Sequence, residues 1–345
     1  MQLQDFQPQS KLVSQHSQVT RPRFPVIDAH NHLGDPFGGG WHKKPLAQLL
    51  DQLDQANVRT YIDLDGGWGE DILHAHLDYF KQPAPDRFII FGGVDWSKWP
   101  ELGNRFPEWA AGRLRLQKER GAQGLKIWKP FGLHVRDQHG TLVHTGDTRL
   151  DPLWQTAGEL GLPVLAHVAD PVAFFDPIDA SNERWEELGA NPDWAFTSPP
   201  FPPFLEILTG FRQVVRRHPA TTFIGAHVGC YAENLAWVGA MLDECPNYHI
   251  DISARLGELG RQPYSARRFF LQYAGRILFG LDTGPSLPNY HISYRFLETD
   301  DEYFNYNTGP IPRQGRWFIN GIFLPDDVLA RVYHQNAARL FNLSI

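Results

Sequence analysis

The stretch VIDAHNH, residues 26–32, decides how this chain is interpreted. It is an apolar run that ends in two histidines two positions apart, and Gly-Asp-Pro at 34–36 closes it. Side chains at positions i and i+2 of a β-strand point to the same side. The imidazoles of His30 and His32 would therefore leave one strand end together, as two ligands of a single cation must. A catalytic zinc ion typically has three such protein ligands plus a water. Two structural histidines after a strand are the alternative that this stretch alone leaves open.

The bulk composition limits the classes of protein to consider. The chain has 345 residues, 42% hydrophobic and 21% charged, which is ample for a large core. A net charge of −7 argues against a nucleic-acid surface, which needs a basic footprint. The two cysteines, Cys230 and Cys245, cannot form a disulfide framework and favour a reducing compartment. No apolar run could span a bilayer, and residues 1–20 lack the apolar core of a secretory signal. We therefore expect a cytoplasmic protein that binds neither nucleic acid nor membrane.

Eight apolar segments are typical of buried strands, and most are separated by segments of helical periodicity. The predicted strands are residues 26–32, 58–64, 87–95, 124–128, 163–168, 221–227, 248–253 and 276–282. The predicted helices are residues 45–57, 71–82, 108–121, 152–161, 204–218, 234–244, 264–273 and 325–341. Strands that alternate with helices imply parallel pairing.

Eight such strands favour an α/β fold of the (β/α)8 TIM-barrel type, which needs about 250 residues. Extended βα-loops after strands four, five and eight, at 129–150, 169–203 and 284–317, account for the surplus. We expect a polar N-terminal arm, 1–24, and a single barrel domain, 25–345. An open doubly wound sheet is the alternative. It would normally bring a Gly-x-Gly-x-x-Gly turn, which the sequence lacks.

The predicted strands carry side chains that could serve a metal site, and most of these lie at strand ends. They are His30, His32, Lys126, His167, His227 and Asp282. Each has a structural explanation on its own, such as a hydrogen-bonded histidine, or a turn at Asp282 before Thr283-Gly284. Closing a barrel brings these positions to one rim, where barrel enzymes build their sites. The joint pattern therefore predicts a mononuclear metal site.

Six segments carry a family resemblance that spans the chain from about residue 25. They are DAHNH at 28–32, GLK at 124–126, VLAH at 164–167, IGAHVG at 224–229, LFGLD at 278–282 and NAARLF at 336–341. The sequence resembles the amidohydrolase superfamily, and within it the amidohydrolase-related (amidohydrolase 2) branch. That branch includes metal-dependent hydrolases and the aminocarboxymuconate-semialdehyde and γ-resorcylate decarboxylases. The segments are specific for the superfamily and only weakly indicate a reaction.

The resemblance implies a ligand set and roles. His30, His32, His167 and Asp282 would bind one divalent ion, with Zn²⁺ expected first. Asp282 and His227 would also be catalytic, with His227 expected to hold or deprotonate the metal-bound water or to interact with the substrate. The residue types fit this chemistry, because Asp282 can accept a proton from the metal-activated water and His227 can stabilise the charge on an attacked carbonyl. Some members of the superfamily hold two metals bridged by a carboxylated lysine on the fourth strand, where Lys126 stands. The alternative is that Lys126 pairs with a substrate carboxylate.

Substrate-binding residues are predicted on the loops near the same rim. Arg255 and Arg184 are candidates because a guanidinium grips a carboxylate bidentately, and a structural ion pair is the alternative for each. Trp128 could wall an apolar pocket with further loop aromatics, namely Phe131, Phe174, Phe175, Trp185 and Trp194. His74 and His76 lie in a predicted helix, where side chains two positions apart diverge. The loop histidines His134, His139, His144 and His291 receive no role.

Three functions are compatible with this pattern. The first is a metal-dependent hydrolase that acts on a small, carboxylate-bearing substrate with a C–N, C–O or lactone-type bond. The alternative is a non-oxidative decarboxylase of an aromatic or enoic acid on the same metal site. The third is a barrel that only binds a ligand. The sequence names neither the substrate nor the number of metals, and it leaves a homo-oligomer open.

Overall fold

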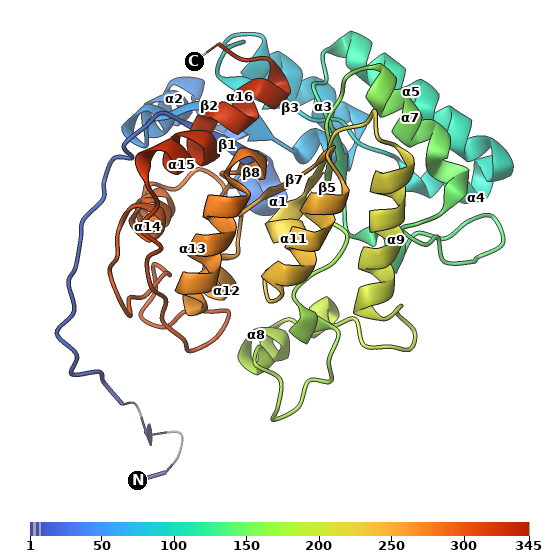
Figure 1. Cartoon of the computed structure of the whole chain (residues 1–345). Coiled ribbons are helices and arrows are strands. Elements are labelled where there is room, and N and C mark those ends of the chain that lie inside the picture. Colours follow the sequence, from blue (N-terminus) through green and yellow to red (C-terminus); the bar gives the residue numbers. More distant parts are fainter. Residues whose placement is uncertain (3–4, 7, 345) are drawn as a thin grey trace.

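Eight short strands lie at the centre of the computed structural model, which describes residues 1–2, 5–6 and 8–344 (Figure 1). The strands are β1 (Val26–Asn31), β2 (Val58–Asp63), β3 (Phe88–Ile90), β4 (Leu125–Ile127), β5 (Val164–Ala166), β6 (Phe223–Gly225), β7 (Tyr248–Asp251) and β8 (Ile277–Leu278). They pair in parallel as two sheets, β1-β2-β3 and β4-β5-β6-β7-β8.

Backbone hydrogen bonds bridge both seams between the two sheets. Gly92 N donates to Gly124 O at 3.0 Å beside β3 and β4, and Ala29 N donates to Phe279 O at 2.9 Å between β1 and the end of β8. The strands therefore follow one another around a ring in chain order. The predicted (β/α)8 TIM-barrel class is confirmed.

The interior of the ring is filled by one apolar side chain from most strands. These side chains, all fully buried, are Ile27, Ile62, Ile89, Leu165, Ile224 and Leu278. Alternate strand residues point outward instead, such as Val26 and Tyr61, which belong to the core under the helices. The closing helix α16 (Asn336–Phe341) packs Ala337 and Phe341 against the inner group.

Helices cover the outside of the strands (Figure 1). The principal ones are α2 (Leu46–Gln55), α3 (Glu70–His76), α5 (Phe106–Arg120), α7 (Asp151–Glu159), α9 (Phe204–Arg217), α11 (Leu235–Glu244), α13 (Pro263–Gln272) and α15 (Asp326–Ala330). Each lies within or close to a predicted range. Shorter helices in the loops are α1 (Asp35–Gly38), α4 (Trp99–Leu102), α6 (Pro130–Leu133), α8 (Trp185–Ala190), α10 (Ala226–Gly229) and α12 (Leu256–Arg261). In α9, buried residues at Phe204, Ile207, Phe211 and Val214 form the apolar stripe that periodicity predicts.

The structure corrects the prediction of a loop throughout 284–317. Helix α14 (Leu287–Glu298) occupies its first part, so His291 is a helical residue. Pro288 stands in the first turn, where proline is tolerated, and Tyr290, Tyr294 and Leu297 are buried at helical spacing. The tyrosines of this stretch therefore belong to an amphipathic helix. The proline and tyrosine content concealed that periodicity.

Several predicted elements are shorter or interrupted. The sequence predicts the last strand at 276–282, but its pairing with β7 ends at Leu278. Asp282, with a left-handed φ of 61°, is not part of a strand. The predicted helices at 71–82 and 325–341 each contain a π-helical turn, at Leu77–Lys81 and Arg331–Gln335.

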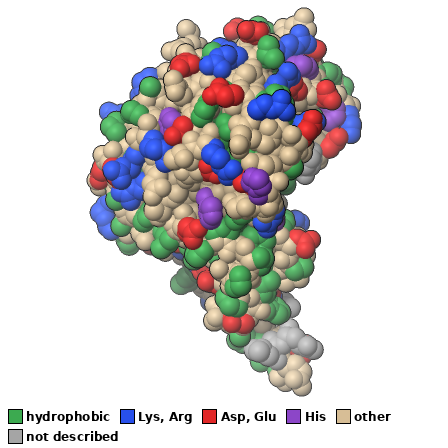
Figure 2. Space-filling view, turned by 90° about the vertical axis from the view of Figure 1, so that its right-hand side faces the viewer, with side chains coloured by type: hydrophobic (Ala, Val, Ile, Leu, Met, Phe, Trp, Pro, Cys, Tyr) green, Lys and Arg blue, Asp and Glu red, His purple; other side chains and the backbone are tan. Residues whose placement is uncertain are grey.

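The loop insertion at 169–203, which carries α8, lies at the end of the barrel opposite the C-terminus (Figure 1). Ion pairs tie it to other βα-loops, with Glu183 2.8 Å from Arg261 and Glu186 2.7 Å from Arg316. The second half of the N-terminal arm is held on the barrel, where Ser17 N and Oγ donate to the Asp301 carboxylate at 2.6 and 2.8 Å. On the face shown in Figure 2, basic and acidic side chains are interspersed. Within the part of the chain that the structure describes, no helix is both long and apolar enough to cross a membrane.

Replacing Leu165 with Ala tests whether the ring interior is a packed core. Leu165 is fully buried among the inner apolar side chains, so its loss leaves a cavity. We expect the free energy of unfolding to fall by about 2–5 kcal/mol, measured by urea denaturation. Leu205 on α9 is half exposed, and Leu205→Ala is the matched control, with an expected loss below about 1 kcal/mol. Equal losses in the two variants would contradict a packed interior.

Candidate metal centre and active site

His30 and His32, at the end of β1, are buried and each has one ring nitrogen held by a carboxylate. His30 Nδ1 lies 2.9 Å from Asp251 Oδ2, and His32 Nδ1 lies 2.7 Å from Asp65 Oδ1. Because an ionised carboxylate only accepts, each Nδ1–H donates, and each Nε2 points away from these carboxylates. Both Nε2 atoms face Asp282 Oδ1, at 3.6 Å from His30 and 2.8 Å from His32. The two imidazoles are thus oriented toward one point.

The stretch 28–31 also fixes the segment that carries Asp282. Asp282 N donates to His30 O at 2.9 Å. On either side of it, Leu281 N donates to Asp28 at 3.2 Å, and Gly284 N donates to Asn31 at 2.7 Å. These bonds hold Asp282 in its left-handed conformation. Its side chain is 24% exposed against 1% for each histidine, so Asp282 is the member of this group most open to the cavity.

The donor atoms of His30, His32 and Asp282 fit a single divalent cation. They lie within 4.8 Å of one another. Ligating histidines commonly donate their second ring N–H to a carboxylate, as both of these do. Burial lowers the pKa of His30, which keeps that imidazole in the neutral form that binds a metal. The residues present therefore suit a metal site of the predicted kind.

His32 Nε2 lies 2.8 Å from Asp282 Oδ1, and a cation bound by both groups would lie between them. Burial lowers the pKa of His32, but Asp282 and Asp65 outweigh burial and raise that pKa to about 9. Burial would raise the pKa of Asp282, yet the surrounding histidines hold it well below its usual range. A divalent cation between the two groups would displace the proton on His32, so binding of a metal should release protons.

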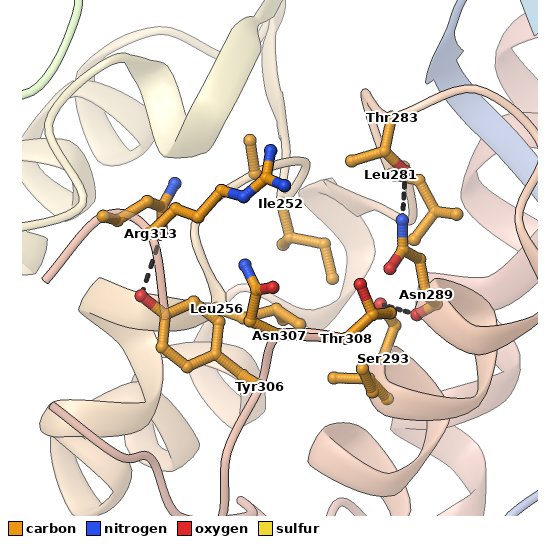
Figure 3. A pocket seen from close by; sticks show the side chains of 14 residues that line it. Ile252, Leu256, Leu281, Thr283, Asn289, Ser293, Tyr306, Asn307, Thr308 and Arg313 are labelled. Carbon is orange, nitrogen blue, oxygen red and sulfur yellow. Dashed lines mark hydrogen bonds between the residues drawn. The ribbon is translucent and has the colours of Figure 1, made fainter. Parts of the chain in front are cut away.

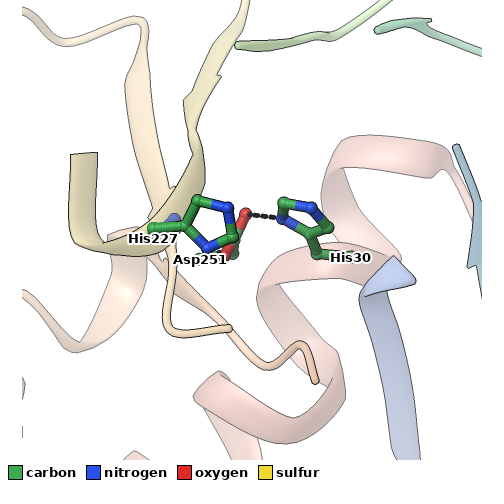
Figure 4. A group of neighbouring side chains, drawn as sticks. All are labelled: His30, His227 and Asp251. Atoms are coloured by element: carbon green, nitrogen blue, oxygen red, sulfur yellow. Dashed lines mark hydrogen bonds and ion pairs between the residues drawn. The ribbon is translucent and has the colours of Figure 1, made fainter. Parts of the chain in front are cut away.

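A second group of candidate ligands consists of His30, His227 and Asp251, shown in Figure 4. In this group Asp251 is already engaged. Its Oδ2 accepts from His30, and its Oδ1 accepts from the backbone N–H groups of His227 and Ser253 at 3.1 and 3.0 Å. Asp251 is therefore better suited to orient His30 than to bind a cation directly.

His227 and His167, at the ends of β6 and β5, stand beside the first group. His227 Nδ1 is 2.9 Å from Ser253 O, and its Nε2 is 3.6 Å from Asp282 Oδ2. The His167 ring lies 4.4 Å from the His227 ring, but its Nε2 faces Asp170 Oδ1 at 3.2 Å. Burial lowers the pKa of His167 to about 4 although Asp170 opposes it, so His167 is neutral. Its role as a metal ligand stays a prediction.

The candidate ligands open into a cavity of about 440 Å³. Arg255 and Trp128, predicted as substrate-binding residues, both line it. Arg255 donates to Ala254 O at 2.8 Å, and among the described residues it has no carboxylate partner. Trp128 stacks on His32 with ring centroids 5.4 Å apart.

Arg184 and Lys126 differ from Arg255 and Trp128, because Arg184 is held in ion pairs and Lys126 is buried in a strand. Arg184 lines the cavity, but its guanidinium pairs with Glu258 and lies 2.6 Å from Glu187, as in the structural alternative. Lys126 is buried in β4, with its Nζ 4.7 Å from the Trp128 ring. Burial lowers the pKa of Lys126 to about 8, and within the described part of the chain its Nζ has no hydrogen-bond partner. Substrate binding by Arg184, and a second metal or a substrate carboxylate at Lys126, stay predictions.

The aromatic lining agrees only in part with the predicted set. Trp128, Phe174 and Trp194 line the cavity, and so do the unpredicted Phe37, Trp68 and Phe196. The predicted Phe131 instead packs on Trp96, and Trp185 is 55% exposed.

Sequence reasoning missed the carboxylates that orient the histidines, which are Asp65, Asp170 and Asp251. All three lie at or just after the ends of strands β2, β5 and β7. That position, together with the need of each ligating imidazole for a carboxylate, was the signal that could have found them. His76 is confirmed as separate from the site, because it lies in α3 and pairs with Asp63 at 2.6 Å.

A family model described as amidohydrolase matches residues 27–343. The chain belongs to the amidohydrolase family. Its structure is similar to 2,6-dihydroxybenzoate decarboxylase from Rhizobium at 16% identity, covering 92% of this chain and 98% of that one, with a TM-score of 0.57. It is also similar to a dihydroxybenzoic acid decarboxylase from Polaromonas, solved with bound manganese, at 17% identity, 87% and 86% coverage and a TM-score of 0.53. An amidohydrolase from Burkholderia multivorans matches at 13% identity, 93% and 100% coverage and a TM-score of 0.51. At these identities the likeness shows the barrel fold. No curated protein matches the chain.

Asp65→Asn tests whether the carboxylates prepare the imidazoles for a metal. An asparagine amide that donates to His32 Nδ1 would move the ring proton to Nε2 and block the lone pair. We expect affinity for a divalent metal to fall by about 10–100-fold, measured by titration against a competing chelator. Asp71→Asn, on the exposed side of α3, is the control and should bind metal as the parent does. Unchanged affinity in Asp65→Asn would remove the proposed role of Asp65.

Proposed function

We propose that this protein is a metal-dependent, non-oxidative decarboxylase of an aromatic acid. The observation that carries the proposal is the aromatic wall beside the candidate ligands. Trp128 stacks on His32 and, with ring centroids 3.9 Å apart, on Trp68. Phe37 lies 5.5 Å from His32 on the same cavity. An aromatic wall of this kind suits an aromatic ring that must lie close to a metal. The two decarboxylases among the structural neighbours support the same proposal.

His30, His32 and Asp282 would hold one divalent cation, and His167 would complete the set by turning its ring from Asp170. The metal would supply positive charge that draws electron density from an oxygen of the substrate. The manganese of one structural neighbour makes Mn²⁺ as strong a candidate as the Zn²⁺ expected from the sequence. Lys126 could serve a second metal only in carboxylated form, and its buried, unpartnered Nζ in the described chain leaves that role open.

The residues of the chain would bind the acid and manage one proton. Arg255 would hold a carboxylate of the substrate, since its guanidinium faces the cavity without a carboxylate partner among the described residues. Asp282 would pass a proton taken up from solvent water to the ring carbon, the bond between that carbon and the carboxylate would break, and CO2 would leave. His227, whose Nε2 is 3.6 Å from Asp282 Oδ2, is placed to relay that proton from solvent to Asp282.

Hydrolysis is the second candidate, and the description of the matching family model, amidohydrolase, is compatible with it. On the same residues, Asp282 would take a proton from an attacking water. His227 donates its Nδ1–H to Ser253 O, so its Nε2 would accept a hydrogen bond from that water and orient it. The two reactions thus require the same groups and differ in product.

Product analysis separates the two reactions. We expect the metal-loaded protein to release CO2 from a hydroxylated benzoate, with 2,6-dihydroxybenzoate as the first substrate to test. In D2O the product should carry one deuterium at the carbon that lost the carboxylate, because the proton is delivered from an exchangeable group. Mass spectrometry and CO2 measurement provide the readouts, and Asp282→Asn is the inactive control. Turnover of lactones or amides without CO2 from any hydroxybenzoate would establish hydrolysis instead.

His227→Asn should retain the metal and slow turnover. His227 lies beside the three candidate ligands and not among them, so its loss should cost about 10²–10⁴-fold in kcat through impaired proton transfer. Metal content and kcat are measured on the same preparation, with His74→Asn, a change in helix α3, as control. Loss of the metal would make His227 a ligand, and unchanged kcat would remove its catalytic role.

A further inference from the structure

A second cavity, of about 300 Å³, adjoins the candidate active site. It lies between the chain that follows β7 and β8 and helix α14, beneath the loop that carries Arg313. Leu281 and Thr283, on either side of Asp282, line it, whereas Asp282 lines the first cavity. Ala254 and Gln314 line both cavities. The two cavities are therefore neighbours that share part of their walls.

The lining of the second cavity is suited to an anion. Arg313 is the one charged side chain among the described residues that line it, and no carboxylate is present there. Figure 3 shows the Arg313 guanidinium and the Asn307 amide projecting into the cavity. Within the described chain Arg313 has no ion pair or hydrogen bond, whereas Arg316 on the same loop is paired with Glu186 at 2.7 Å.

Hydrogen bonds within the wall engage some side chains and leave others, among them Arg313 and Asn307, with donors for a ligand. Asn289 Nδ2 donates to Thr283 Oγ1 at 3.0 Å, and Tyr306 OH donates to Gln314 Oε1 at 3.1 Å, so these side chains are engaged with one another. Asn307 Oδ1 accepts from Gly309 N at 3.0 Å, which leaves Asn307 Nδ2 as a donor. A guanidinium next to a free amide N–H is complementary to the two oxygens of a carboxylate.

We propose that the second cavity binds a distal carboxylate of the substrate, with Arg313 as its anchor. The substrate would then be a dicarboxylic acid, whose reacting end lies at His30, His32 and Asp282 and whose other end lies at Arg313. The identity of the reacting end rests on the proposed function, but the anion subsite rests on the lining of the second cavity. Two carboxylates on one molecule bind more tightly than one because the second contact is intramolecular.

Matched carboxylates test this proposal on the metal-loaded protein. Dissociation constants are measured by calorimetry for benzoate against isophthalate and terephthalate, hexanoate against adipate, and octanoate against suberate. Because Arg313 is exposed, we expect a gain of about threefold or more for at least one dicarboxylate over its partner. Arg313→Gln should abolish this gain and Arg313→Lys should keep part of it. Arg316→Gln, on the same loop but outside the cavity, should leave it unchanged.

The proposal is overturned if no dicarboxylate reaches a threefold gain, or if the gain survives Arg313→Gln. A second outcome would be two monocarboxylates bound per chain, with no higher affinity for any dicarboxylate. Arg313 would then bind a separate anion, and the proposal of a dicarboxylic substrate would be overturned. Binding is measured without turnover, so the two proposals fail separately. An Arg313-dependent gain without CO2 release would leave the subsite in place and reject decarboxylation.

Discussion

The candidate site depends on the junction between the first and last strands of the barrel. Within four residues of β1, Asp28 and Asn31 accept from the backbone of Leu281 and Gly284, while the carbonyl of His30 accepts from Asp282. The end of β1 therefore supplies the imidazoles of His30 and His32 and also fixes the position of the Asp282 carboxylate. Because these are buried hydrogen bonds, closure of the ring and assembly of the metal centre are one structural event.

Electrostatics then prepares the cluster for a cation. Carboxylates behind the rings hold Nδ1–H of His30 and His32, and burial keeps His30 neutral. Without a metal, the buried charge of Asp282 is balanced by a proton on His32. A bound divalent ion would replace this proton and neutralise the charge of Asp282. It would lie next to the aromatic wall of the cavity. The cavity thus combines a site for positive charge with an apolar surface, as a small aromatic acid requires.

Much of this arrangement could be predicted from the sequence, for a physical reason. The period of two in β1 places His30 and His32 on one side, and a parallel barrel brings every strand end to one rim. Asp65 was missed because an aspartate after a strand is equally typical of a turn. Asp251 was missed because it lies within the predicted strand 248–253. The partner of Arg184 was not predictable, since Glu258 is 74 positions away and meets it only through the fold of the insertion. Helix α14 was missed because its tyrosines and proline resemble a loop.

The location of the bound metal tests the central claim most directly. Crystals of the metal-loaded protein, measured at the absorption edge of the metal, give an anomalous peak whose position is independent of phase bias. We predict one peak in contact with the Nε2 atoms of His30 and His32 and a carboxylate oxygen of Asp282. A peak bound by His227 and Asp251 instead, or no peak near β1 in protein shown to contain stoichiometric metal, would contradict this account.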